Sequence, residues 1–424
     1  MTQASASSNP TAAAPAAGNM PLSHVRVLDL SRVLAGPWAA QNLADLGAEV
    51  IKVERPGTGD DTRAWGPPFL SDENGKLTNE AAYFMGINRG KRSITVDLSR
   101  PEGQELVRQL AERSDVIIEN YKAGNLARYG LDYASICKVN PRIVYCSITG
   151  FGQDGPYRDR PAYDFLIQGM SGLMSVTGER ADRPGGGPMK VGIPIADLMT
   201  GLYADVAILA ALTHRDRTGQ GQHIDLALLD VQISVMTGRS LGYFMTGEVP
   251  LANGNEHPNI VPQTVFPCRD GHLIIVVGND SQFLSLCQAM GVPEMARDPR
   301  FATNPNRVIN RDELNAMVIG HLSQRDRDYW VAQLEEKGVP CGPINNIKQT
   351  FDDPQVQHRQ MQVQMQHPLG GSVSLVGNPI KYSATPITYR VAPPLLGQHT
   401  DAVLGGTLGL SKDSIDRLRQ QKII

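Results

Sequence analysis

The sequence predicts an α/β protein in which a large domain with a parallel sheet is joined to a smaller α+β domain. Strand-like runs alternate with amphipathic helical segments at the start, a hairpin followed by helices occupies the middle, and the last segment has too few apolar residues for a separate domain. We therefore expect a large domain from residues 21–225, a small α+β domain from residues 226–330, and a segment of residues 331–424 that returns to the large domain. Residues 1–20 are expected to form a disordered tail.

The first predicted unit is a strand, a helix and a second strand. Residues 24–30 (HVRVLDL) alternate branched apolar and polar side chains, and residues 38–46 favour a helix that ends at Gly47. Residues 49–53 (EVIKV) form the second apolar run. Such a unit is predicted to be a right-handed crossover between parallel strands.

The same alternation continues along the chain. Ser99, followed by Glu102, fits a capping box before an amphipathic helix. Further strands are predicted at residues 116–118 and 142–148, which favours a parallel sheet. A long helix over residues 198–215 and a strand from residue 222 then complete the first part of the large domain.

The middle of the chain has a different pattern. Asp270 and Gly271 lie between two apolar runs, which indicates a β-hairpin. Helical periodicity returns at residues 281–290 and 311–337. In the C-terminal segment, a short strand at residues 372–376 and a closing helix from Ser411 are predicted.

Composition excludes several classes of protein. The chain has 40 basic and 43 acidic residues, with a net charge of −3, so we expect neither a nucleic-acid partner nor an anionic membrane surface. The longest apolar stretch, residues 199–212, contains Asp205 and is too short to span a bilayer. No two of the five cysteines form a CxxC pair, so we expect reduced thiols and no metal site. Residues 1–19 contain no Lys or Arg and no continuous apolar run, unlike a secretory or mitochondrial presequence, so we expect a cytoplasmic location.

Known catalytic motifs are missing from the first half. The turn after the first strand, from Leu30 to Pro37, lacks the glycine pattern of dinucleotide-binding folds, and no phosphate-binding P-loop motif occurs. No histidine lies between His24 and His214, which excludes Ser-His and Cys-His pairs there. Arg55 and the basic residues 89–92 lie near predicted strand ends and suit a phosphate, although a solvated basic surface is the alternative.

Eight collinear runs carry a family resemblance that covers residues 21–424. They are LSRVLAGPWAAQNLADLGAEVIKVERPGTGD, NRGKRSITVDL, IIENYKAG, NPRIVYCSITGFGQDGP, RPAYDFLIQGMSG, TGQGQHIDLALLD, GVPCGP and APPLLGQHTDAVL. Together they resemble the class III coenzyme A transferases of the CaiB/BaiF type, a family that includes formyl-CoA transferase, carnitine CoA-transferase, succinyl-CoA:dicarboxylate CoA-transferases and 2-methylacyl-CoA racemase. The resemblance implies a Rossmann-like large domain built from both ends of the chain and an interlocked homodimer.

The resemblance also implies the nucleophile. The family's catalytic aspartate matches Asp197 in the run GIPIADL, and its supporting acidic residue matches Asp164. A carboxylate that attacks a thioester forms an acyl anhydride and conserves the energy of the bond for transfer. Taken alone, Asp197 also suits a helix N-terminus, and Asp164 also suits a turn cap. The racemase branch has a histidine where this chain has Tyr163, and a tyrosine is a poor base at neutral pH.

The remaining site residues also follow from the resemblance. The CoA-binding residues that match are Val33, Leu34, Ala35, Arg55, Val96, Asn120 and Arg128. Candidate substrate-binding residues are Arg32, Arg92, Gly254 and His257, although for His257 a hydrogen-bonded turn is the favoured role. Where the formyl-CoA branch has a four-glycine loop, this chain has GNEHPN at residues 254–259, and where that branch has a glutamine, this chain has Leu34. These differences favour a dicarboxylate substrate, such as succinate, glutarate, malate or citramalate, or carnitine.

The sequence therefore predicts an acyl-CoA:carboxylate CoA-transferase that acts through Asp197. CoA is expected as a substrate, with no metal and no permanently bound cofactor. A 2-methylacyl-CoA racemase is the alternative within the family, and a non-catalytic CoA-binding protein is the alternative from another class.

Overall fold

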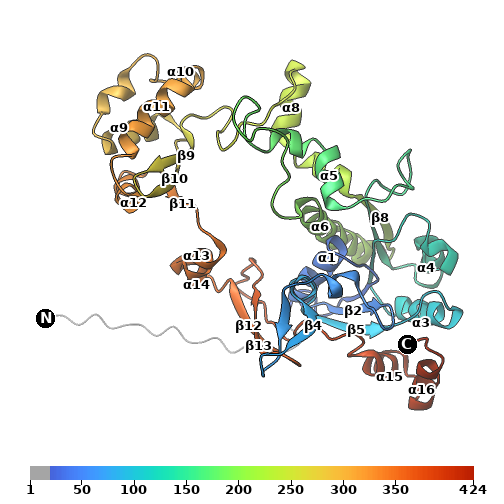
Figure 1. The fold of residues 1–424 in the computed structure, drawn as a ribbon. Helices are drawn as coiled ribbons and strands as arrows, with labels where there is room; N and C mark the ends of the chain where they lie inside the picture. The colour runs from blue at the N-terminus through green and yellow to red at the C-terminus, as the bar shows by residue number, and fades with distance from the viewer. Residues whose placement is uncertain (1–19) are drawn as a thin grey trace. The chain divides into compact units, whose positions relative to one another are not determined.

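The computed structural model describes residues 20–424, which form two compact units (Figure 1). Of the described residues, unit 1 contains 20–171, Ile193–Met236 and Arg359–Ile424, and unit 2 contains Gly172–Gly192 and Thr237–His358. The predicted tail lies outside the described residues, apart from Met20, which is buried. Both ends of the described chain thus belong to the same unit.

Unit 1 is built on a six-stranded parallel sheet, as predicted. Its order is β5-β2-β1-β6-β7-β8, so the direction of strand addition reverses between β1 and β6. Numbered within the sheet, this is the 3-2-1-4-5-6 order of Rossmann folds, in which ligands bind at the carboxyl ends of the strands where the order reverses. The strands are β1 (Arg26–Asp29), β2 (Glu49–Glu54), β5 (Lys91–Thr95), β6 (Val116–Glu119), β7 (Val144–Thr149) and β8 (Gln222–Ala227).

Helices cover both faces of this sheet, each over its own apolar core. The helices that contribute to one core are α1 (Ala35–Asp45), α5 (Asp164–Met170), α6 (Ile195–Thr218) and α7 (Leu228–Ser234). Those that contribute to the other are α3 (Pro101–Glu112), α4 (Tyr133–Val139), α15 (Thr400–Leu408) and α16 (Lys412–Gln420), and Figure 1 shows the red C-terminal pair beside α3. The C-terminal helices therefore complete a core that the N-terminal segment begins.

Helix α6 is long and apolar enough, by length and composition alone, to cross a membrane. Its residues Ala204, Ile208 and Ala211 are nevertheless fully buried in the core of unit 1. Asp205 on the same helix accepts a hydrogen bond from Asn42 Nδ2 of α1 at 2.9 Å. These contacts are those of a core helix.

Smaller elements complete unit 1. Two antiparallel hairpins pair β3 (Phe69–Ser71) with β4 (Leu77–Ala81) and β12 (Gln362–His367) with β13 (Gly371–Val376). The short elements are α2 (Ala82–Met85) and the 3-10 helices η1 (Asp61–Ala64) and η2 (Leu126–Tyr129). Only β13 of the second hairpin was expected from the sequence.

Unit 2 contains the predicted hairpin, formed by β9 (Gln263–Cys268) and β10 (Gly271–Val276). Its core also includes residues of α9 (Asp280–Ala289), α11 (Arg311–Leu322) and α12 (Arg327–Glu336). The expected boundary at residue 330 differs from this division, because β11 (Cys341–Pro343) pairs with β10. The short elements are η3 (Leu173–Val176), α8 (Thr237–Thr246), η4 (Pro293–Arg297), α10 (Asn304–Ile309), α13 (Ile347–Asp352) and α14 (Pro354–His358).

Two local predictions are wrong. The helix expected over residues 311–337 is interrupted between Leu322 and Arg327, giving α11 and α12. The capping box does not form, because Ser99 Oγ donates to Asp97 Oδ1 at 2.7 Å and α3 begins after Arg100 without a side-chain cap. An Asp two residues before a serine competes for its hydroxyl in this way.

Candidate active site

The loops after β1 and β6 meet at the point where the strand order reverses. Asn120, directly after β6, holds the loop after β1 by two hydrogen bonds. Its Oδ1 accepts from the Arg32 N–H at 2.9 Å, and its Nδ2 donates to the Arg32 carbonyl at 2.6 Å. Because both amide atoms are used, Asn120 is placed to position residues 33–35 of this loop.

The loop after β1 carries backbone strain. Val33 has a φ of 72°, a left-handed conformation that is unfavourable for a β-branched residue. Its N–H donates to Asp60 Oδ1 at 3.2 Å. Leu34 and Ala35 follow at the N-terminus of α1, where no side chain caps the helix. Strain of this kind persists where surrounding contacts fix the backbone, and it is frequent at functional sites.

Close packing of α6 against α1 brings Asp197 to this loop. A Cβ on Gly201 would lie 2.8 Å from the Ala35 carbonyl oxygen, so only glycine permits this approach. Asp197 precedes Gly201 by four residues and therefore lies on the same face of α6. The carboxylate of Asp197 is thus directed toward the loop that contains Val33, Leu34 and Ala35.

Asp164 caps the helix that carries Asp197. Its Oδ1 accepts hydrogen bonds from the N–H groups of Ala196 at 2.7 Å and Asp197 at 3.3 Å, and its Oδ2 accepts from Gln168 Nε2 at 2.6 Å. Helix α6 otherwise begins at Pro194 without a side-chain cap. The sequence suggested two roles for Asp164, a capping residue and a neighbour of Asp197. The same carboxylate has both positions in the structure.

Burial and charge make Asp197 an unusual carboxylate. Desolvation, and secondly the negative charge of Asp164, raise the pKa of Asp197 to about 7. The two carboxylates also affect Tyr83 of α2. Burial, and secondly the negative charges of Asp197 and Asp164, raise the pKa of Tyr83 to about 12. Its phenol therefore stays protonated at neutral pH and can only donate a proton to a hydrogen bond with a carboxylate. Nothing in the sequence near Tyr83 indicated this position.

A cavity of about 210 Å³ lies beside Asp197. It brings together five of the predicted residues, namely Arg32, Val33, Leu34, Ala35 and Asn120, and it also contains Tyr163. Sequence reasoning missed its other polar side chains, which are Tyr121, Lys122, Thr149, Arg158 and Arg160. The cavity thus combines one carboxylate of raised pKa with several cationic groups.

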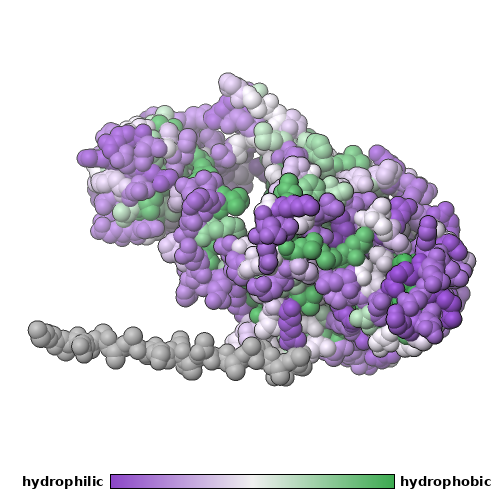
Figure 2. Space-filling view, turned by 60° about the horizontal axis from the view of Figure 1, so that its bottom comes forward, coloured by the Kyte–Doolittle hydropathy of each residue, from purple (hydrophilic) through white to green (hydrophobic). Residues whose placement is uncertain are grey.

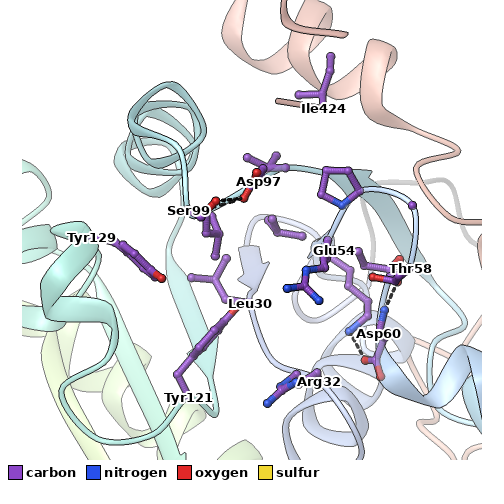
Figure 3. A pocket seen from close by; sticks show the side chains of 18 of the residues that line it. Leu30, Arg32, Glu54, Thr58, Asp60, Asp97, Ser99, Tyr121, Tyr129 and Ile424 are labelled. Carbon is purple, nitrogen blue, oxygen red and sulfur yellow. Dashed lines mark hydrogen bonds and ion pairs between the residues drawn. The ribbon is translucent and has the colours of Figure 1, made fainter. Parts of the chain in front are cut away.

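A second cavity, of about 840 Å³, opens at the same edge of the sheet (Figure 3). It contains the three remaining predicted CoA-binding residues, Arg55, Val96 and Arg128. Arg32 and Tyr121 line both cavities, so the two are adjacent. A volume of this size is in the range of cofactor sites.

Buried ion pairs support the wall of the larger cavity. Lys52 Nζ lies 2.9 Å from Asp60 Oδ2, and Glu54 receives two hydrogen bonds of 2.8 Å from Arg63. Desolvation opposes the charge of Lys52, but the carboxylates of Asp60, Asp29 and Glu54 more than offset it, so the pKa of Lys52 is raised. These pairs fix the end of β2 and the segment after Arg55.

Arg92, predicted to bind substrate, does not line either cavity. It lies at the start of β5, at the opposite edge of the sheet from the carboxyl ends of the strands. There Arg92 Nη1 pairs with Glu49 Oε1 at 2.8 Å. Arg92 therefore lies apart from the predicted residues that line the two cavities, because the start of a parallel strand and the residues that follow the strand lie at opposite edges of the sheet. Arg32 does line the site, but its guanidinium already pairs with Asp61 at 2.8 Å.

Gly254 and His257 belong to unit 2. Gly254 has a φ of +60°, and a Cβ there would lie 2.8 Å from Glu179 Oε1. His257 Nδ1 accepts a hydrogen bond from the Asn259 N–H at 3.1 Å, and Arg311 donates to the His257 carbonyl at 2.8 Å. These contacts place His257 in a hydrogen-bonded turn, as one of the two interpretations of the sequence expected.

Comparison with known families identifies the family to which the chain belongs. The model of CoA-transferase family III matches residues 22–400. The chain belongs to this family. The predicted activity class, acyl-CoA:carboxylate CoA transfer, is confirmed by this match and by the curated relatives of the class III transferase.

Two curated relatives of the class III transferase share much of its sequence. It is 50% identical over 384 residues to a succinate–glutarate CoA-transferase of Agrobacterium fabrum, covering 91% of this chain and 95% of that protein. It is 41% identical over 404 residues to the human succinyl-CoA:glutarate CoA-transferase, covering 95% of this chain and 90% of that protein.

Solved structures agree with the fold of the class III transferase. A CaiB/BaiF family protein from Brucella suis has a TM-score of 0.81 and 48% identity, covering 92% of this chain and 99% of that one. A hypothetical protein from Mycobacterium tuberculosis has a TM-score of 0.79 and 29% identity, covering 92% and 99% of the two chains.

Proposed function

We propose that this enzyme transfers CoA from succinyl-CoA to a dicarboxylate of similar length, such as glutarate, with Asp197 as the nucleophile. The observation that carries the proposal is the pair of adjacent cavities, one large enough for the nucleotide of CoA and one beside Asp197. The names of the relatives with 50% and 41% identity support the two substrates.

The reaction needs only acyl exchange at Asp197. Its carboxylate attacks the thioester carbon, the C–S bond breaks, and an acyl-aspartyl anhydride forms with release of CoA thiolate. The thiolate attacks the aspartyl carbonyl, which releases the donor carboxylate and leaves CoA as a thioester on Asp197. The acceptor carboxylate then attacks this thioester, forms a second anhydride, and frees the thiolate. Attack of the thiolate on the acceptor acyl group completes the exchange and restores Asp197.

The environment of Asp197 suits this chemistry. A desolvated carboxylate is a stronger nucleophile, and its raised pKa keeps it largely ionised only above about pH 7. The uncapped N-terminus of α1 at Leu34 and Ala35 lines the same cavity, so its N–H groups are available to a developing oxyanion. Tyr163 takes the place of the histidine that a racemase would need as a second base.

Two guanidinium groups beside Asp197 support a dicarboxylate substrate. Within residues 20–424, neither Arg158 nor Arg160 forms an ion pair, whereas Arg32 of the same cavity pairs with Asp61. Arg160 instead packs over the ring of Tyr157, with its Cζ 4.4 Å from the centroid. An arginine without a protein carboxylate is suited to bind the distal carboxylate of the substrate.

The test is a panel of acceptors with succinyl-CoA as donor. The wild-type enzyme should form glutaryl-CoA and give little product with butyrate, which resembles one end of glutarate but lacks the second carboxylate. Arg158→Gln should lower kcat/KM for glutarate by on the order of tenfold and leave that for butyrate nearly unchanged. Lys138→Gln, on α4 outside both cavities, serves as the charge control. Inversion of an α-carbon with solvent deuterium uptake, or no turnover with any acceptor, would contradict the proposed function.

We also propose the interlocked homodimer that the family resemblance implies. Large apolar side chains are exposed on α5, α6 and α7, and Figure 2 shows apolar patches on the surface of the chain. On these helices the exposed residues include Phe165, Leu166, Met170, Leu202, Tyr203, Val206 and Ile233. Exposed apolar area of this kind is typical of an interface. Light scattering that reported only the mass of one chain would contradict the proposal.

A further inference from the structure

Lys422 lies where helix α16 ends, in a backbone motif that usually contains glycine. The Lys422 N–H donates to the Arg419 carbonyl at 3.0 Å, and the Ile423 N–H donates to the Leu418 carbonyl at 2.9 Å. These two bonds define a Schellman motif in which Lys422 takes the left-handed position, with a φ of 58°.

Other helices of this chain use glycine where Lys422 stands. Helix α6 ends with Gly219 at a φ of 77°, and α15 ends with Gly409 at a φ of 74°. A side chain in the left-handed region crowds the neighbouring carbonyl oxygen, which glycine avoids. A lysine at this position therefore indicates a role for its side chain that the helix end itself does not require.

The backbone around Lys422 is fixed against the larger cavity. Ile423 is fully buried in the core of unit 1, and its carbonyl accepts a hydrogen bond from the Asp97 N–H at 2.7 Å. Asp97 and Lys422 both line the cavity that contains Arg55. The lysine is thus held at the cavity wall by a buried neighbour.

Charge balance in this cavity leaves room for an anion. Six cationic and four carboxylate side chains line it. Arg32, Lys52 and Arg419 form ion pairs with protein carboxylates. Within residues 20–424, the other three cations, Arg55, Arg128 and Lys422, have no ion-pair partner. The carboxylates Glu54, Asp60 and Asp61 are themselves paired, and Asp97 accepts from Ser99.

The position of Lys422 indicates which anion it meets. In Figure 3, Arg32 and Tyr121, which also line the cavity beside Asp197, lie at one end, and Ile424 lies at the opposite end. A CoA thioester placed at Asp197 therefore directs its adenosine toward the segment that contains Lys422. The phosphate farthest from the thioester in CoA is the 3′-phosphate of the ribose.

We propose that Lys422 binds the 3′-phosphate of CoA and enables the enzyme to discriminate CoA from 3′-dephospho-CoA. The proposal deepens the proposed function and rests on its CoA site. A lysine ammonium is a suitable point charge for a phosphate monoester. Its side chain can adjust to that ligand, while the Schellman motif fixes its backbone.

Calorimetric binding of CoA and of 3′-dephospho-CoA tests the proposal directly. The wild-type enzyme should bind CoA more tightly by on the order of tenfold. Lys422→Gly and Lys422→Gln should bind CoA about tenfold more weakly and 3′-dephospho-CoA unchanged, whereas Lys422→Arg should keep the preference. Lys412→Gln removes a positive charge from the same helix outside the cavity and should change neither affinity.

The glycine variant separates recognition from folding. Because glycine suits the left-handed position, Lys422→Gly should melt at the same temperature as the wild type or higher. If the Lys422 variants bound both ligands equally more weakly, Lys422 would contact another part of CoA. If their preference for CoA over 3′-dephospho-CoA were unchanged, Lys422 would have no role in recognition. Either result overturns the proposal. Binding is measured without turnover, so an enzyme that discriminates the two ligands but exchanges no CoA would contradict only the proposed function.

Discussion

Asp197→Asn should lower kcat for CoA exchange by on the order of 10³ or more, which corresponds to about 4 kcal/mol of barrier. The amide has nearly the shape of the carboxylate but cannot form an anhydride with the acyl group. CoA should still bind, because Arg55, Arg128 and Lys422 lie in the other cavity. Initial rates with succinyl-CoA and glutarate, together with calorimetric CoA binding, measure both effects.

The Asp197 variants should also be more stable at alkaline pH. The pKa of Asp197 is raised in the folded protein, so its ionisation destabilises the fold: the cost is absent below the unfolded pKa near 4, grows as the pH rises from about 4 to about 7, and stays constant at higher pH. Asparagine and alanine remove this cost, and both variants should melt at a higher temperature than the wild type at pH 8. Loss of activity with gain of stability is the expected signature of a functional carboxylate.

A trapping experiment distinguishes covalent chemistry from a binding role of Asp197. During turnover, hydroxylamine should convert the activated side chain into a hydroxamate on the peptide that carries Asp197, and mass spectrometry detects it. Asp197→Ala should give no modified peptide; it also avoids the slow deamidation by which asparagine can regenerate aspartate. Modification of another residue, or near-normal exchange by the alanine variant, would exclude Asp197 as the nucleophile.

The large sheet could be predicted because its strands alternate with helices and carry apolar runs. Strand β5, the third strand of this sheet along the chain, was harder to predict. Its Lys91 is fully buried and donates hydrogen bonds to Asp29, Asn88 and the Pro37 carbonyl. A lysine in a short run suggests an exposed position, and only the folded chain provides its three partners. The return of the C-terminal segment to the large domain was predicted from its low apolar content, but nothing local shows which of the two cores its helices complete.

The structure brings together predicted site residues that directly follow strands. Arg55 follows β2 and Asn120 follows β6, and the carboxyl ends of parallel strands meet at one edge. On other elements, Asp197 of α6 and Arg128 of η2 were named only through the family resemblance, and further residues were not predicted. Arg158, Tyr83 and Lys422 come from a loop, a short helix and a helix end, and their proximity to the site depends on tertiary packing.

Asp164→Asn should shift the acid limb of the kcat/KM profile to lower pH by about one unit. The negative charge of Asp164 is the second cause, after desolvation, of the raised pKa of Asp197. Removing that charge lowers the pKa, so Asp197 is ionised at lower pH. The asparagine oxygen can still accept from the N–H groups of Ala196 and Asp197, which keeps the helix cap. The pH dependence of kcat/KM, measured from pH 5 to 9, gives the shift.

A matched control on the same helix makes the shift specific. Asp205 is also buried with a raised pKa, but it lies two turns along α6, about 12 Å from Asp197. Asp205→Asn should therefore leave the acid limb in place. An acid limb that stays fixed or moves to higher pH in Asp164→Asn would contradict the electrostatic role of Asp164. Above pH 8 the variant should be slower than the wild type, because a less basic Asp197 is a weaker nucleophile. One carboxylate thus fixes the nucleophile's helix and sets the pH at which the nucleophile is charged.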